Sequence, residues 1–129
     1  MRRLFALVFL LSVASLAQPV PVSQYLFRLE PIRKDFSLQN LTEDERRIVV
    51  EHGAFLKRLQ TEGKLVITGQ LFDPNRGYWG ILVVNAGDPA AAAAVMNSDP
   101  LVKQRVVRGE IIPFRTVLMG PAPDSAGPR

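Results

Sequence analysis

The sequence contains no cysteine and a single histidine. Without cysteine there can be no disulfide bonds, thiolate metal sites, cysteine nucleophile or lipid attachment through a cysteine. One histidine among scattered carboxylates also lacks the ligand spacing of known metal motifs. No glycine-rich phosphate loop follows an expected strand, so nucleotide binding has no support. We therefore expect no metal site and no cofactor.

The sequence also has only a small excess of basic over acidic residues. The formal net charge is +4 over 129 residues, and the basic residues are interspersed with acidic ones. A nucleic-acid groove or a polybasic membrane patch requires basic residues gathered on one surface. We expect neither nucleic acid nor a charged membrane surface as a partner.

The first 17 residues have the composition of an export signal. Arg2 and Arg3 precede a short apolar run, and small residues lead up to Ala17, where a signal peptidase would cleave. The apolar run is short and interrupted by serines, so stable insertion into a bilayer is not expected. Cleavage would leave 112 residues with a formal charge of +2 in a periplasm or outside the cell. An uncleaved N-terminal anchor is the alternative.

The remaining chain divides into a proline-rich lead-in over 18–22, one domain over 23–119 and a disordered tail over 120–129. Hydrophobic periodicity and turn residues predict the elements of this domain. We expect strands over 23–30, 64–72, 78–84 and 110–118, helices over 42–63 and 88–96, and a possible helical turn within 101–107.

This order of elements predicts an α+β fold, the ferredoxin-like βαββαβ sandwich with an antiparallel sheet. Pro113 lies within the last expected strand, which places that strand at a sheet edge. The strand over 78–84 is apolar on both sides, although the two helices can cover only one face of the sheet. An uncovered apolar face predicts a homodimer that forms through the sheet faces.

The helix over 42–63 carries the single histidine. Thr42 and Glu45 form a capping box at its start, and Gly63 supplies a left-handed stop. His52 lies in the middle of the apolar stripe of this helix. Asp99 stands before a proline at the break after the second helix, where the chain leaves the helical path.

A histidine and an aspartate that meet can perform acid–base chemistry. A carboxylate that accepts a hydrogen bond from one imidazole nitrogen fixes the tautomer and leaves the other nitrogen available to move a proton. His52 and Asp99 are therefore the candidate catalytic pair. From residue types alone, His52 as a core histidine and Asp99 as a helix stop remain the alternatives.

The connection over 31–41 is longer than usual, and loops of this length often serve as lids or binding loops. Arg33, Lys34 and Phe36 are its side chains best suited to an anionic or aromatic ligand, and a solvated loop is the alternative. Tyr78 and Trp79 on the third expected strand would line such a site together with Phe36.

The sequence resembles the YciI-like family, whose members carry YCII-related domains and belong to the dimeric α+β barrel superfamily. The resemblance covers about residues 24–118. It is carried by His52 with Phe55-Leu56 and Leu59, Glu62-Gly63-Lys64-Leu65, Thr68-Gly69, the hairpin to Gly80-Ile81, the alanine-rich helix, Ser98-Asp99-Pro100 and Pro113-Phe114.

The resemblance implies that His52 and Asp99 form an acid–base dyad beside a pocket. It also directs attention to Gly69 and Ser98, which we place with Phe36 and Trp79 as candidate substrate-binding residues. Relatives in the superfamily include muconolactone isomerase-like proteins and a dehydrochlorinase. The chain departs from the family pattern at Gln70 and Leu101, so no substrate is carried over from these relatives.

Two functions of different classes follow. The first is a cofactor-independent enzyme of the isomerase or lyase type, in which the His52–Asp99 dyad moves a proton on a small cyclic or aromatic substrate. The second is a non-catalytic dimeric module that binds a small ligand. The identity of the ligand stays open in both.

Overall fold

The elements of the domain follow the predicted order. The structure, a computed structural model, describes residues 23–73, 75 and 77–121. They form β1 (Gln24–Pro31), α1 (Glu43–Thr61), β2 (Leu65–Asp73), β3 (Gly77–Asn85), α2 (Pro89–Ser98), α3 (Pro100–Lys103) and β4 (Val107–Phe114). The ferredoxin-like βαββαβ fold is thereby confirmed, with α3 as the extra helical turn. The predicted export segment 1–17, the lead-in 18–22 and residues 122–129 of the predicted tail lie outside the described residues.

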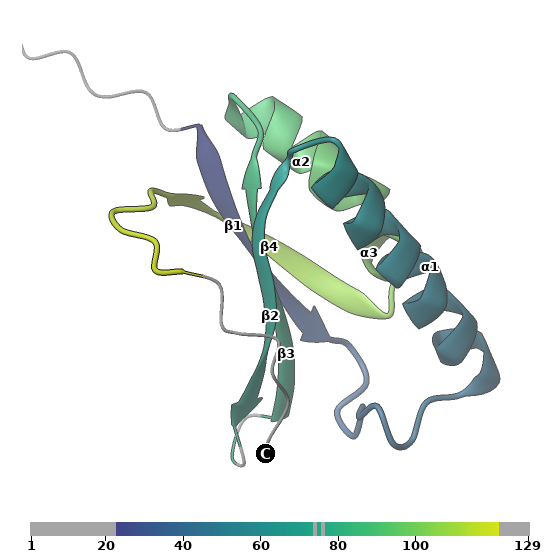
Figure 1. Cartoon of the computed structure of the whole chain (residues 1–129). Helices are drawn as coiled ribbons and strands as arrows, with labels where there is room; N and C mark the ends of the chain where they lie inside the picture. The colour runs from purple at the N-terminus through teal and green to yellow at the C-terminus, as the bar shows by residue number, and fades with distance from the viewer. Residues whose placement is uncertain (1–22, 74, 76, 122–129) are drawn as a thin grey trace, which may run out of the picture.

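The four described strands form one antiparallel sheet in the order β2-β3-β1-β4. The helices lie together on one face of this sheet (Figure 1). Of the described strands, β4 pairs with β1 alone and is therefore an edge strand, as predicted from Pro113. Pro113 lies opposite Tyr25 in this pairing, and its missing amide hydrogen costs no bond to a further strand.

The hydrophobic core lies between the sheet and the helices. Alternate residues of β1 point to it, and each of Tyr25, Phe27 and Leu29 is at most 3% exposed. Helix α2 can approach the edge of the sheet closely because β4 has Gly109 there. A Cβ atom at this position would lie only 2.5 Å from the sulfur of Met96. The other strands and α1 complete the core with Leu82, Val84, Ile48, Phe55 and Leu59.

The ends of α1 agree with the sequence analysis. The Thr42 side chain accepts a hydrogen bond from the Glu45 amide, and the Glu45 side chain accepts one from the Thr42 amide. Gly63 follows the helix with a φ of 69°, a conformation that glycine adopts without steric cost. This helix is therefore fixed in position at both ends, and His52 lies near its centre.

The last strand differs from the prediction. It runs over Val107–Phe114 rather than 110–118. Its pairing begins with Val107 opposite Pro31 and ends with Phe114 opposite Gln24, so the length of its single partner β1 sets both limits. The apolar residues at 117–119, which favoured a longer strand, have no strand beside them and are exposed.

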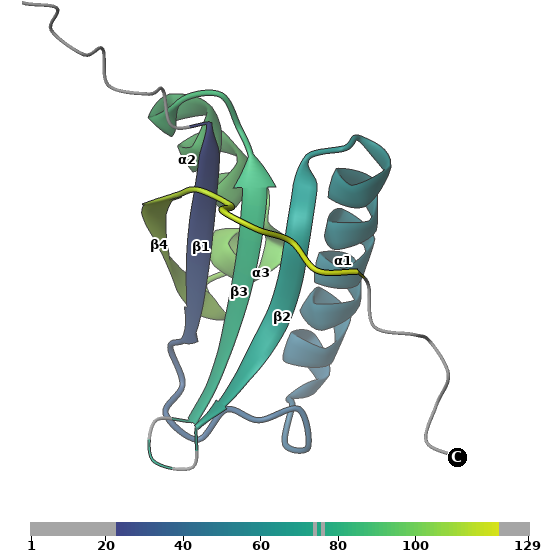
Figure 2. The ribbon, with the colours of Figure 1, turned by 60° about the vertical axis from the view of Figure 1, so that its left-hand side comes forward.

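Among the described residues, no helix covers the second face of the sheet. After β4 the chain turns back on this side, opposite the helices (Figure 2). Ile67, Leu71 and Ile112 are exposed apolar side chains here. Arg28 also lies on this face, where its guanidinium is 4.7 Å from the centre of the Trp79 ring. Within the described part of the chain, no helix has the length and apolar character needed to cross a membrane.

Candidate active site

The two predicted dyad residues lie in direct contact. The His52 Nδ1 and the Asp99 Oδ1 are 2.8 Å apart, although 47 residues separate them in the sequence. The Asp99 side chain is 2% exposed and the His52 side chain 16% exposed. An ionised carboxylate can only accept hydrogen bonds, so the hydrogen of the neutral imidazole belongs on Nδ1. The Nε2 is then left with its lone pair available.

The break between α2 and α3 places the aspartate. Asp99 is the last residue before Pro100 and has an extended backbone, with a ψ of 123°. Its Oδ1 accepts a second hydrogen bond, from the amide of Leu101 at 2.9 Å, and so caps α3. Among the described residues, Asp99 is the one charged side chain that is buried. The carboxylate is therefore held by backbone and imidazole together.

The helix α1 places the histidine. Ile48, Phe55 and Leu59 of this helix are buried in the core, and the ring of Phe55 lies 6.2 Å from the His52 ring at an interplanar angle of 29°. This contact and the bond to Asp99 fix the imidazole from two directions. The apolar stripe predicted from the sequence thus holds the imidazole at the edge of the core, where it is partly exposed.

A cavity of about 370 Å³ adjoins His52. It lies between α1, the loop after β1 and the helix-covered face of the sheet. Most of its lining is apolar, and polar side chains are few: His52, Thr68, Gln70 and Tyr78. Asp99 is not part of this lining and lies behind the imidazole. The other lining residues are Leu29, Pro31, Phe36, Leu38, Val49, Leu56, Gly69, Gly80, Leu82, Leu101 and Val107.

Of the four predicted substrate-binding residues, Phe36 and Gly69 line the cavity and the other two do not. Trp79 points to the uncovered face of the sheet, because neighbouring residues of a strand alternate between faces and Tyr78 points to the cavity. The Ser98 hydroxyl donates to the carbonyl of Val95, one turn back in α2, at 2.7 Å. Neither Trp79 nor Ser98 is therefore placed to contact a ligand beside His52.

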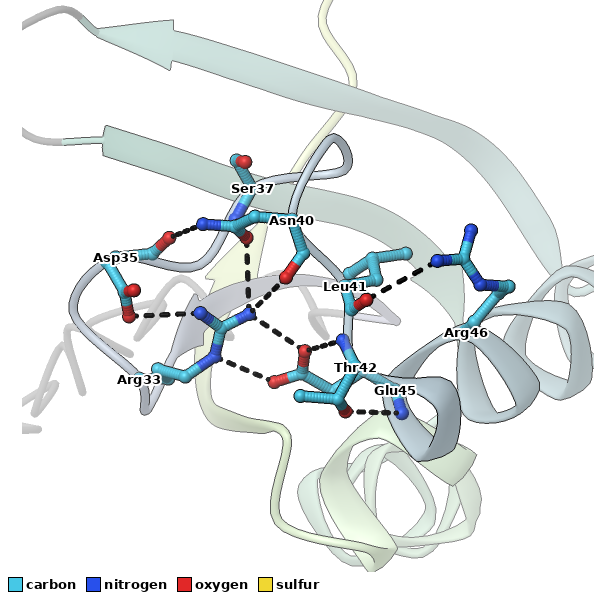
Figure 3. A network of polar contacts seen from close by, with 8 residues as sticks. All are labelled: Arg33, Asp35, Ser37, Asn40, Leu41, Thr42, Glu45 and Arg46. Atoms are coloured by element: carbon cyan, nitrogen blue, oxygen red, sulfur yellow. Dashed lines mark hydrogen bonds and ion pairs between the residues drawn. The ribbon is translucent and has the colours of Figure 1, made fainter.

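Phe36 reaches the cavity from the long loop after β1, and a polar network holds this loop (Figure 3). The Arg33 guanidinium donates two hydrogen bonds to the Glu45 carboxylate, at 2.8 and 3.0 Å. It also donates to Asp35 and to both oxygens of Asn40. Arg33, a candidate for binding an anionic ligand, thus forms its hydrogen bonds with residues of the protein itself.

The same network changes the titration of its acid. Hydrogen bonds from Arg33 lower the pKa of Glu45 below its usual value, and the amide of Thr42 acts in the same direction. At neutral pH the Glu45 carboxylate is ionised and bonded on both oxygens. The loop that carries Phe36 is therefore fixed to the start of α1, the helix that carries His52.

Several lining residues had no sequence signal of their own. Val107 belongs to a strand whose pairing with β1 brings it to the cavity, and strand pairing over such distances is not visible in local periodicity. Within the described residues, no group of three histidine, cysteine or acidic side chains is arranged to hold a metal ion. The site is a partly buried acid–base pair that opens on a small apolar cavity.

The comparisons place this chain in a known family. The model of the YCII-related domain matches residues 24–115, and the chain belongs to this family. Among solved structures, the chain is similar to 5-chloro-2-hydroxyhydroquinone dehydrochlorinase from Burkholderia phenoliruptrix in complex with 2,5-dihydroxybenzoquinone. The two share 16% sequence identity with a TM-score of 0.54, over 71% of this chain and 93% of the other. No curated protein matches the chain.

Proposed function

We propose that this protein is a cofactor-independent enzyme of the isomerase or lyase type that acts on a small cyclic or aromatic compound. The observation that carries the proposal is the 2.8 Å contact between His52 and the buried Asp99 at the wall of a cavity. The Nε2 of His52 has no protein partner among the described residues. A base with one nitrogen anchored and one nitrogen facing a cavity is equipped for proton transfer.

In this mechanism the His52 Nε2 takes a proton from a substrate carbon next to a carbonyl group. The electron pair of the broken C–H bond forms a new double bond, and either a leaving group departs or the proton returns at another position. Asp99 holds the imidazole in the required tautomer and stabilises the imidazolium that forms. The substrate supplies its own electron acceptor, so the reaction needs no further group.

The size and character of the cavity support a small ring as the substrate. A volume of about 370 Å³ is at the lower end of the range for ligand sites. Its largely apolar wall suits the faces of a ring, and Phe36 and Tyr78 provide aromatic contact. The dehydrochlorinase of similar fold acts on such a ring, 5-chloro-2-hydroxyhydroquinone, which makes this compound the first substrate to test.

The decisive experiment measures chloride release from 5-chloro-2-hydroxyhydroquinone by the wild type and by His52→Ala. We expect turnover in the wild type and a loss of at least about 100-fold in the variant. Val50→Ala is the matched control, since Val50 lies on the same helix but is 70% exposed. A folded His52→Ala variant that retains turnover contradicts the proposal. Wild-type binding of this compound without conversion instead supports the non-catalytic module.

We further propose that the protein is a homodimer that forms through the uncovered face of the sheet. The exposed apolar side chains Ile67, Leu71 and Ile112 support this interface. Light scattering of the wild type at micromolar concentration is expected to give twice the mass of one chain. Ile67→Glu is expected to give a single-chain mass, and a monomeric wild type would contradict the assignment.

The composition of residues 1–17 supports an exported enzyme. We propose that the segment is cleaved after Ala17 and that the enzyme works in a periplasm or outside the cell. Mass spectrometry of the protein from its native host is expected to show a chain that begins at residue 18. An intact N-terminus would contradict cleavage.

A further inference from the structure

Tyr78 carries a buried hydroxyl group that makes no hydrogen bond within the described part of the protein. Among the buried side-chain nitrogen and oxygen atoms of the described residues, it is the one without a hydrogen-bond partner. Buried polar groups in folded proteins are almost always paired, and an exception calls for an explanation. The hydroxyl belongs to a residue that lines the cavity beside His52, so the explanation we consider is a ligand.

The position of the Tyr78 ring is set by its neighbours. Tyr78 lies on the helix-covered face of β3, two residues before Gly80, which also lines the cavity. Its ring packs edge-on against Phe72 at 5.4 Å and lies 6.2 Å from the ring of Phe36. Two aromatic contacts therefore hold the phenol ring in the cavity wall.

The other polar side chains of the cavity are accounted for. The Thr68 hydroxyl donates to the carbonyl of Ile81 at 3.1 Å, and Gln70 is exposed to solvent. His52 uses its Nδ1 for Asp99 and keeps its Nε2. Among the described cavity residues, the Tyr78 hydroxyl is thus the hydroxyl whose hydrogen has no acceptor in the protein, and the His52 Nε2 is a ring nitrogen without a protein partner.

We propose that the Tyr78 hydroxyl is a specificity-determining group that donates a hydrogen bond to an oxygen substituent of the ring held beside His52. This inference rests on the proposed function and narrows its substrate class to rings that carry a carbonyl, phenol or enol oxygen. An apolar ring without such an oxygen would leave the hydroxyl unpaired, and sites built around a polar group reject ligands that cannot pair with it.

Two properties of Tyr78 suit it to this role. Burial raises the pKa of its hydroxyl above the usual value, so the group stays protonated at neutral pH and can donate. The ring packs against the buried Phe36 and also contacts Phe72, so little freedom is lost when the hydrogen bond forms. The Tyr78 hydroxyl on the sheet side of the cavity is thus the hydrogen-bond donor, and His52 on α1 is the base.

The test compares Tyr78→Phe with the wild type by calorimetric titration with 2,5-dihydroxybenzoquinone. We expect the variant to bind about tenfold more weakly, because one hydrogen bond to the ligand is lost. Tyr25→Phe is the matched control. It removes the hydroxyl of the other tyrosine, which is buried in the same core but does not line the cavity, and should leave binding unchanged.

A second measurement tests the proposal without a ligand. If the Tyr78 hydroxyl has no partner in the empty protein, Tyr78→Phe should keep or raise the melting temperature. A lower melting temperature would show that the hydroxyl serves the fold and would overturn the inference. Equal affinity of wild type and Tyr78→Phe would overturn it as well, while the proposed function would stand. A wild type that binds neither this quinone nor hydroquinone would overturn both.

Discussion

The protein has two pairs of a basic and an acidic side chain, Arg33–Glu45 and His52–Asp99, with similar contact distances and different surroundings. In the loop, Arg33 and Glu45 are joined by two hydrogen bonds of 2.8 and 3.0 Å. In the dyad, His52 and Asp99 are joined by one of 2.8 Å. Arg33 uses further donors for Asp35 and Asn40, whereas His52 lines the cavity and has one ring nitrogen without a partner among the described residues.

The comparison shows that a charged pair does not define a functional site by itself. In the Arg33–Glu45 pair both carboxylate oxygens and most of the guanidinium hydrogens are bonded within the protein, so its main role is to fix the loop. The His52–Asp99 pair has unused capacity beside a cavity, and that combination allows chemistry. Substitutions in the first pair should therefore affect stability, and substitutions in the second should affect activity.

The largest effect is expected from Asp99→Ala. The substitution removes the hydrogen bonds that the buried Asp99 carboxylate accepts from His52 and from the Leu101 amide, and losing two bonds to a charged group lowers the free energy of unfolding by about 3 kcal/mol. Turnover should be lost as well. Asp88→Ala is the matched control, because Asp88 also caps a helix but is exposed, and its loss should cost about 1 kcal/mol. Urea denaturation measures both, and equal losses would contradict a contribution from His52.

Asp99→Asn separates orientation from structure. The amide has nearly the shape of the carboxylate and can still accept from the Leu101 amide, so the stability loss should be well below that of Asp99→Ala. An amide can also donate, so it no longer fixes the histidine tautomer. We expect turnover to fall by at least about 100-fold while the fold persists. Unchanged turnover would mean that the contact is structural.

Arg33→Lys is the corresponding test of the Arg33–Glu45 pair in the loop. A lysine cannot reproduce the two parallel hydrogen bonds to Glu45 together with those to Asp35 and Asn40. The melting temperature should fall, while the affinity for 2,5-dihydroxybenzoquinone should change less than about twofold, which is close to the error of a titration. A variant that keeps its stability but loses the ligand would show that Arg33 contacts ligand after all.

The smallest effect is expected from Glu45→Gln, and it should depend on pH. The folded-state pKa of Glu45 is lowered, so its contribution to stability is present above the unfolded-state value near 4.5 and is lost as pH falls through the folded-state value. The introduced amide would still cap α1 but would lack the charge. The melting temperatures of wild type and variant should therefore differ at pH 7 and converge as the pH falls below the folded-state pKa of Glu45. A constant difference would contradict the ionic contribution.

Local sequence rules were sufficient for most of the fold. The capping box of Thr42 with Glu45 and the proline after Asp99 act over a few residues, so their consequences are visible in the sequence. Residue chemistry suggested His52 and Asp99 as a pair, and the family resemblance then supported a contact between these residues, which are 47 apart in the sequence. The match of residues 24–115 to the YCII-related domain confirms the resemblance itself, and the catalytic role of the pair stays a prediction.

The predictions that differ from the structure concern residues whose position depends on contacts between distant parts of the sequence. The apolar run of β3 has no polar alternation, so nothing local indicates that Tyr78 faces the cavity and Trp79 the other side. The limits of β4 depend on the length of β1. Arg33 could be assigned as a loop anchor only once Glu45 and Asn40 were placed beside it.

The measurement that tests the central claim most directly is the tautomer of His52 by 15N nuclear magnetic resonance. The chain has one histidine, so its ring nitrogens give one set of signals. The 2.8 Å contact with Asp99 predicts that Nδ1 carries a hydrogen, so the neutral form of the ring should have its hydrogen on Nδ1, and the Nε2 signal should shift when 2,5-dihydroxybenzoquinone is added. A neutral ring with its hydrogen on Nε2 would contradict the proton-transfer site. An Nε2 chemical shift that stays the same when the ligand binds would contradict it as well.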